Sequence, residues 1–151
     1  MNFEKYLLLK NAALKNCLAE GKEYPDVKTL NPIVLAYIGD VVFSSYVRLR
    51  FLPASGQVRI LHDLTAKMVS AVCQAEAMKK IAESLNEEEK NIYHRGRNAK
   101  SMVPKSATVQ EYREATALEA LIGYLFLSDK SERCEEIMET AFQIIVEKLK
   151  K

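Results

Sequence analysis

The feature that most constrains this chain is a pair of apolar segments that each contain a single acid. Between Ile33 and Phe43 every residue is apolar or small except Asp40, and Glu119 is the only charged residue in the segment 115–127. A helix that is apolar on all sides is buried. An ionised carboxylate in such a helix is costly unless it is paired, hydrogen-bonded or bound to a metal. We therefore expect two buried helices whose acids have a definite role.

Each acid has a glycine near it. Gly39 stands beside Asp40, and Gly123 follows Glu119 by four residues. Glycine inside a helix costs about 1 kcal/mol relative to alanine, and it is tolerated where another backbone or a ligand comes close. The pattern leaves three interpretations open for the acids. They are a structural ion pair with Arg or Lys, oxygen ligands for Mg²⁺ or Mn²⁺ where the two helices cross, and general acid–base catalysis.

The hydrophobic periodicity is helical along nearly the whole chain, and no stretch alternates as a strand does. Asn31 and Pro32 are typical of a helix start, and Thr108 with Glu111 forms a capping box. We therefore predict a single all-α domain. The expected helices span 3–19, 32–51, 57–68, 70–85, 87–97, 108–127 and a last stretch that Asp129 or Ser131 caps and that ends near 148.

Composition narrows the class of protein. A length of 151 residues fits one domain, and 48% apolar with 28% charged residues excludes a disordered chain. No uncharged apolar run reaches the length of a membrane span, and the N-terminus lacks a secretory pattern. The three cysteines are far apart and only two histidines are present, which argues against a zinc site. We expect a cytoplasmic protein with no membrane partner.

The charges are unevenly distributed, although the net charge is only +2. Residues 91–113 hold five bases and one acid, whereas residues 83–90 hold four acids and one base. A local excess of positive charge is the electrostatic footprint of a nucleic-acid-binding surface. We interpret the acidic run 87–89 as a solvated helix start.

Four segments resemble the ribonuclease III family, in the same order along the chain. The segment 35–42 (LAYIGDVV) resembles the signature helix of its catalytic domain, and 118–123 (LEALIG) resembles its second acidic motif. The segments 61–67 (LHDLTAK) and 95–101 (RGRNAKS) are similar to Mini-ribonuclease III, the compact bacterial branch.

The likeness covers about 30–149, so we expect a helical leader over 1–27 and a catalytic domain over 28–151. No double-stranded-RNA-binding domain follows in the printed sequence, as in the compact branch.

The resemblance implies an all-α ribonuclease III catalytic fold that works as a homodimer on double-stranded RNA, with one site for each strand. It implies that Asp40 and Glu119 are the catalytic, metal-binding residues, with Mg²⁺ or Mn²⁺ as cofactor. Water would attack in line and leave 5′-phosphate and 3′-hydroxyl ends. Full-size enzymes carry two further acids where this chain has Ala36 and Thr116, and the compact branch shows the same reduced pattern. The substrate implied is precursor large-subunit (23S) ribosomal RNA.

The resemblance also assigns two surfaces. The RNA-binding residues would be Lys67, Arg95, Arg97, Asn98 and Lys100. The dimer interface would include Tyr37, Val41 and Phe43, because the signature helix lies at the interface in the family. Plain core packing is the alternative for these three residues. A ribosomal protein on the substrate is a further partner that would help binding.

Two other functions are compatible with the same residues. The first is a catalytically silent member of the same fold that binds RNA or the ribosome, which the two absent acids would favour. The second is an unrelated helical dimerisation module whose buried acids form ion pairs. The first predicts RNA binding without cleavage, and the second predicts neither.

Overall fold

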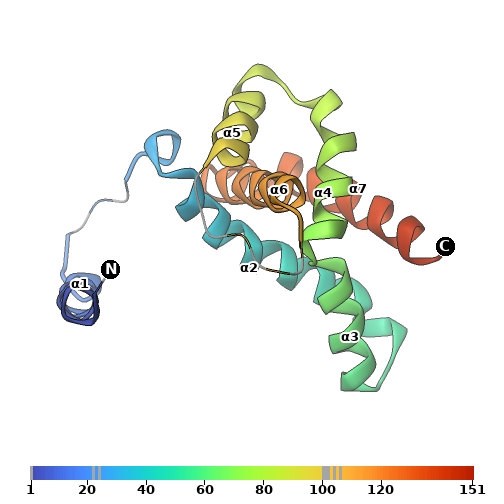
Figure 1. The fold of residues 1–151 in the computed structure, drawn as a ribbon, viewed down its shortest axis with the longest axis horizontal. Coiled ribbons are helices and arrows are strands. Elements are labelled where there is room, and N and C mark those ends of the chain that lie inside the picture. The colour runs from blue at the N-terminus through green and yellow to red at the C-terminus, as the bar shows by residue number, and fades with distance from the viewer. Residues whose placement is uncertain (1, 22, 24, 100–102, 104, 106) are drawn as a thin grey trace.

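A computed structural model describes residues 2–21, 23, 25–99, 103, 105 and 107–151, and within these ranges the regular structure is helical, with no strand (Figure 1). This confirms the predicted all-α class. The helices are α1 (Phe3–Cys17), α2 (Pro32–Phe51), α3 (Val58–Met68), α4 (Ala71–Ile81), α5 (Glu87–Asn98), α6 (Val109–Leu127) and α7 (Ser131–Leu149). Short 3₁₀ segments are η1 (Val27–Thr29), η2 (Leu52–Ala54) and η3 (Ala82–Ser84).

Two helix starts follow the predicted capping chemistry. The Asn31 side chain accepts a 2.9 Å hydrogen bond from the backbone N–H of Ile33. Helix α2 begins at Pro32, directly after this cap. At the start of α6, the backbone N–H of Glu111 donates to the Thr108 hydroxyl at 3.1 Å, and the Glu111 carboxylate accepts from the backbone N–H of Thr108 at 2.9 Å. Both caps are confirmed.

The predicted cap of α7 is wrong. The helix begins after Lys130 without a side-chain cap, so neither Asp129 nor Ser131 serves this purpose. Asp129 instead takes a left-handed backbone conformation, with φ of 55°, and the following N–H donates to the carbonyl of Leu125 at 3.0 Å. The residue is used to end α6 rather than to start α7, because the turn between the two helices is so short.

Helix α6 is the centre of the core. It packs against α2, α4, α5 and α7, and 11 of its 19 residues are buried. In Figure 1 these helices surround α6. Because so many faces are covered, α6 is the apolar, fully surrounded helix that its sequence predicts.

Helix α2 is buried on one face only, which corrects the expectation of a fully buried helix. Tyr37 is 73% exposed and Val41 is 63% exposed, whereas Phe43 has no exposed surface. Phe43 therefore belongs to the core, and its assignment to a dimer interface is wrong because it has no surface to offer a partner. Residues 32–54 are long and apolar enough to cross a membrane by composition, but one face of this helix packs against α6 within the bundle.

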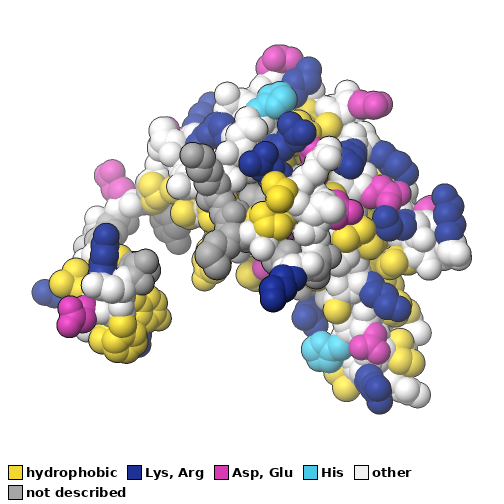
Figure 2. Space-filling model, viewed as in Figure 1, with side chains coloured by type: hydrophobic (Ala, Val, Ile, Leu, Met, Phe, Trp, Pro, Cys, Tyr) yellow, Lys and Arg dark blue, Asp and Glu magenta, His cyan; other side chains and the backbone are white. Residues whose placement is uncertain are grey.

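Helix α1 lies apart from the helical bundle (Figure 1). None of its residues is buried, and hydrophobic side chains such as Phe3, Leu8 and Leu14 are more than half exposed. Figure 2 shows hydrophobic side chains on the surface of α1. The core is therefore built from α2 to α7 without α1.

Candidate active site

The two apolar helices cross in direct backbone contact. A Cβ atom at Gly39 of α2 would overlap the backbone carbonyl of Glu119 in α6, and a Cβ at Gly123 would overlap the carbonyl of Leu35. No other residue type fits these positions without moving the helices apart. This confirms that the glycines beside the two acids serve a close approach.

The crossing brings Asp40 and Glu119 to one pocket. Asp40 follows the contacting residue Gly39 along α2, and Glu119 supplies the carbonyl that Gly39 contacts. The pocket has a volume of about 250 Å³ and is lined by Ile33, Ala36, Tyr37, Asp40, Tyr112, Thr116 and Glu119. Asp40 is exposed and Glu119 is half-buried. The crossing of α2 and α6 thus unites two acids that are 79 positions apart in the sequence.

The environment of the pocket changes the acidity of one carboxyl group. Burial of Glu119, and next the charge of Asp40, raise the pKa of the Glu119 carboxyl to about 7. Within the described part of the chain, neither acid forms an ion pair with Lys or Arg. Among the described residues the acids thus have no ion-pair partner, and metal binding and proton transfer remain the interpretations that a raised pKa in a pocket favours.

Two uncharged residues, where the resemblance implies acids in full-size enzymes, line the same pocket. Ala36 and Thr116 both face it, and the Thr116 hydroxyl donates to the backbone carbonyl of Tyr112 at 2.9 Å. Among the described residues there is no group of three or more His, Cys, Asp or Glu that could hold a metal. The pocket therefore offers two carboxylates and otherwise uncharged walls.

The two arginines of the predicted RNA-binding set have partners inside the protein. Arg95 donates to the backbone carbonyls of Lys28 and Leu30 at 2.8 and 2.6 Å. Arg97 donates to the carboxylate of buried Glu114 at 2.6 Å. These contacts attach α5 to the segment before α2 and to α6. Both arginines thus have a structural role, and their contact with RNA stays a prediction.

The other residues of the predicted RNA-binding set are either exposed or outside the described residues. Lys67, near the end of α3, and Asn98, at the end of α5, are exposed. Lys100 lies outside the described residues. Among the described residues, no hydrogen bond or ion pair joins Lys67 to α5.

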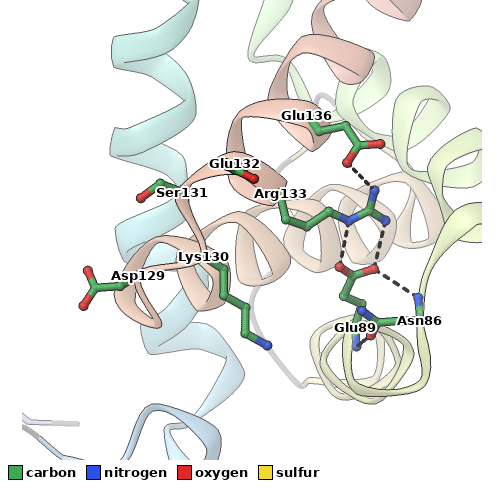
Figure 3. Close-up of a pocket in the computed structure, with 8 residues that line it drawn as sticks. All are labelled: Asn86, Glu89, Asp129, Lys130, Ser131, Glu132, Arg133 and Glu136. Atoms are coloured by element: carbon green, nitrogen blue, oxygen red, sulfur yellow. Dashed lines mark hydrogen bonds and ion pairs between the residues drawn. The ribbon is translucent and has the colours of Figure 1, made fainter.

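The interpretation of the acidic run 87–89 as a solvated helix start is wrong for Glu89. Its side chain is 1% exposed and accepts hydrogen bonds from Arg133 at 2.8 and 3.0 Å and from the backbone N–H of Asn86 at 3.1 Å (Figure 3). The pattern Asn86-Glu-Glu-Glu89 signals a capping box, but nothing in the sequence points to Arg133. The pocket beside this ion pair has a larger volume than the acid pocket, about 640 Å³. Its buried carboxylate, Glu89, is however already neutralised by the guanidinium of Arg133.

The chain is similar to known nucleases over most of its length. A ribonuclease III domain matches residues 33–130. A Mini-ribonuclease 3 from Thermoanaerobacter sp. (strain X514) is 49% identical over 80% of this chain and 87% of its own. A Mini-ribonuclease 3 from Clostridium tetani is 41% identical over 84% of this chain and 87% of its own.

A solved structure shares the fold. A crystal structure of a protein from Fusobacterium nucleatum superposes with a TM-score of 0.74 at 33% identity, over 80% of this chain and 99% of that one. Helix α1 lies outside the residues matched by the ribonuclease III domain. The chain therefore belongs to the ribonuclease III family, in the branch of the Mini-ribonuclease 3 proteins, and is an endoribonuclease.

Proposed function

We propose that the protein is a metal-dependent endoribonuclease that cleaves double-stranded RNA, and that Asp40 and Glu119 form its active site. The observation that carries the proposal is the convergence of these two acids in one pocket at the α2–α6 crossing. Neither is neutralised by a base in the described chain, so both carboxylates are available to a cation. Membership of the ribonuclease III family supports the same reaction.

The donor set of the pocket fits Mg²⁺ or Mn²⁺. Both cations accept carboxylate oxygen, and Mg²⁺ is held by one or two carboxylates while water and phosphate oxygens supply its other ligands. Asp40 is exposed, so water and an RNA phosphate can reach the pocket. The chemistry that such an ion supplies when bound is activation of water and stabilisation of charge on a phosphate.

The residues of the pocket prepare it for this role. Glu119 must be ionised to bind a cation, and its pKa of about 7 makes loading of the site depend on pH around neutrality. Ala36 and Thr116 add no charge beside the two acids, so they leave room for the phosphate and do not repel it. In-line attack of water would then leave 5′-phosphate and 3′-hydroxyl ends.

The exposed face of α2 supports a homodimer. Val34, Tyr37 and Val41 are large apolar side chains that are 46%, 73% and 63% exposed. Covering such a face removes apolar surface from water, which is favourable by about 25 cal/mol per Å². A second copy seated on α2 would place a second pocket on the same assembly, which suits two strands of one duplex.

The substrate that we propose is a double-stranded stem in precursor 23S ribosomal RNA, cleaved in the cytoplasm. Exposed Lys67 and Asn98, together with Lys100, would contact phosphates and 2′-hydroxyls, which read the shape of an A-form duplex. Lysine and arginine side chains are also visible over α5 in Figure 2. A ribosomal protein bound to the precursor would add affinity to this small surface.

A gel cleavage assay on a long RNA duplex tests the proposal. Cleavage is expected with Mg²⁺, and it should stop with EDTA or with Asp40→Asn, because either change removes the cation from the pocket. Asp129→Asn, which changes an acid in the α6–α7 turn, is the matched control and should cleave normally. Each variant is first checked for folding by circular dichroism.

Duplex binding without cleavage in either metal would contradict the enzyme and favour the silent RNA-binding protein instead. Cleavage that persists in Asp40→Asn would remove this residue from the site.

A further inference from the structure

The acid pocket at the α2–α6 crossing has few groups of its own that could bind a phosphate. The described residues that line it include two carboxylates, which repel a phosphate, and the apolar side chains of Ile33 and Ala36. A phosphate oxygen is held by cations and by hydrogen-bond donors. A cation on the two acids would supply the charge, so the donors must come from the other walls of the pocket.

Three hydroxyl groups belong to the described residues that line the pocket, and they are not equivalent. The Thr116 hydroxyl has one proton and already donates it to the backbone carbonyl of Tyr112 at 2.9 Å. Tyr37 is 73% exposed, on the face of α2 that we propose a second copy covers. The third hydroxyl belongs to Tyr112 itself, which is half-buried on α6.

The position of Tyr112 on α6 connects it with the acids. Tyr112 precedes Glu119 by seven residues, about two helical turns, so the two side chains lie on the same face of the helix. Among the described residues its hydroxyl has no hydrogen-bond partner, whereas the hydroxyls of Tyr46 and Tyr93 donate to glutamates. A tyrosine combines an apolar ring with a polar donor, so Tyr112 offers the pocket a neutral donor.

We propose that Tyr112 is a substrate-binding residue, whose hydroxyl donates a hydrogen bond to a phosphate oxygen of the RNA strand that enters the acid pocket. This inference rests on the proposed function, because it needs RNA at this pocket. A neutral donor does not compete with a cation for Asp40 and Glu119. Since Tyr112 lies about 10 Å from Glu119 along the helix axis, it holds the strand equally before and during the reaction.

The test is Tyr112→Phe, which keeps the ring and removes only the hydroxyl. The values of kcat and KM are measured with Mg²⁺ on a duplex RNA. We expect KM to rise about 10-fold, which corresponds to the loss of one hydrogen bond to a charged group, while kcat stays nearly unchanged. The urea unfolding midpoint should not change, because the packing of the ring is retained.

The dependence of KM on salt separates this donor from a basic side chain. Loss of a lysine contact reduces the salt dependence by about one phosphate, whereas loss of a neutral donor leaves it unchanged. Tyr112→Phe should therefore raise KM by the same factor at low and at high salt. Tyr6→Phe is the matched control and should change none of these values, because it lies on α1, which buries none of its residues.

Tyr112→Leu separates the role of the hydroxyl from that of the ring. A KM that rises in Tyr112→Leu but not in Tyr112→Phe would assign the RNA contact to the ring and overturn the hydrogen bond. An unchanged KM in both variants would overturn any contact of Tyr112 with the substrate.

Failure of the proposed function gives a different result. An original protein that binds duplex RNA but does not cleave it would overturn that function alone. The Kd of Tyr112→Phe for the same duplex, from fluorescence anisotropy with Mg²⁺, would then test the inference, with the same 10-fold loss expected. An original protein that neither binds nor cleaves the duplex would overturn both proposals.

Discussion

At the scale of single residues, the site depends on a carboxyl group that the fold makes reluctant to ionise. Burial and the charge of Asp40 raise the pKa of Glu119 from about 4.5 to about 7. Between these pH values the folded chain holds a proton that the unfolded chain has lost. Stability of the metal-free protein should therefore decrease as the pH rises from about 4.5 to about 7, because ionisation is easier in the unfolded chain.

Glu119→Gln tests this cost. The amide cannot ionise, so at pH 8 the metal-free variant should be more stable than the original protein, by up to about 3 kcal/mol. The advantage should vanish near pH 4, where the original carboxyl group is protonated. Urea unfolding with EDTA at both pH values measures the difference. A variant that is less stable at pH 8 would contradict the raised pKa.

The sequence identifies some of these residues and not others, for a physical reason. Asp40 and Glu119 stand out because each is a lone charge in an apolar segment, a contrast that is visible over a few neighbours. Glu89 does not stand out, since glutamate is an ordinary residue of a helix. Its importance comes from its burial and from a partner on another helix, because Arg133 lies 44 positions from Glu89.

At the scale of helices, the α2–α6 contact controls the geometry of the pocket. Gly39 and Gly123 let the two backbones touch. The two acids lie at this contact, because Asp40 follows Gly39 and Glu119 is the residue that Gly39 contacts. Helix positions were predictable because periodicity and caps are local signals. The apolar pattern alone did not predict the exposed face of α2, because exposure depends on which element covers the other side; the family resemblance pointed to it through Tyr37 and Val41.

Gly39→Ala tests the importance of the contact. The added Cβ would overlap the backbone carbonyl of Glu119, so the helices must separate, and the free energy of unfolding should fall by about 3 kcal/mol. Gly56→Ala is the matched control, because nothing lies within 4 Å of a Cβ at that position. Urea denaturation measures both variants. Equal effects in the two would show that the helices yield easily at their crossing.

At the scale of the whole molecule, the described chain has an uncovered apolar face and a helix that stands apart from the core. The face lies on α2, and Val34, Tyr37 and Val41 contribute to it. Helix α1 buries none of its residues. Neither feature adds to the core of α2 to α7, so the face of α2 is free to form the homodimer that we propose.

Val41→Lys tests the dimer. A charge on the exposed face of α2 would have to be desolvated in the interface, so the protein should sediment as a monomer while its helical content stays unchanged. Leu8→Lys, an equally apolar exposed position on α1 that is 69% exposed, is the control and should keep the assembly. A dimeric Val41→Lys protein in analytical ultracentrifugation would place the interface elsewhere.

The backbone contact at Gly39 has a mechanical consequence. Where two rods cross, rocking one against the other moves their ends far and the crossing region much less. Asp40 and Glu119 sit at this fulcrum. Thermal rocking of α2 on α6, or strain applied to their ends by RNA or a second subunit, should leave the gap between the two carboxyl groups nearly constant.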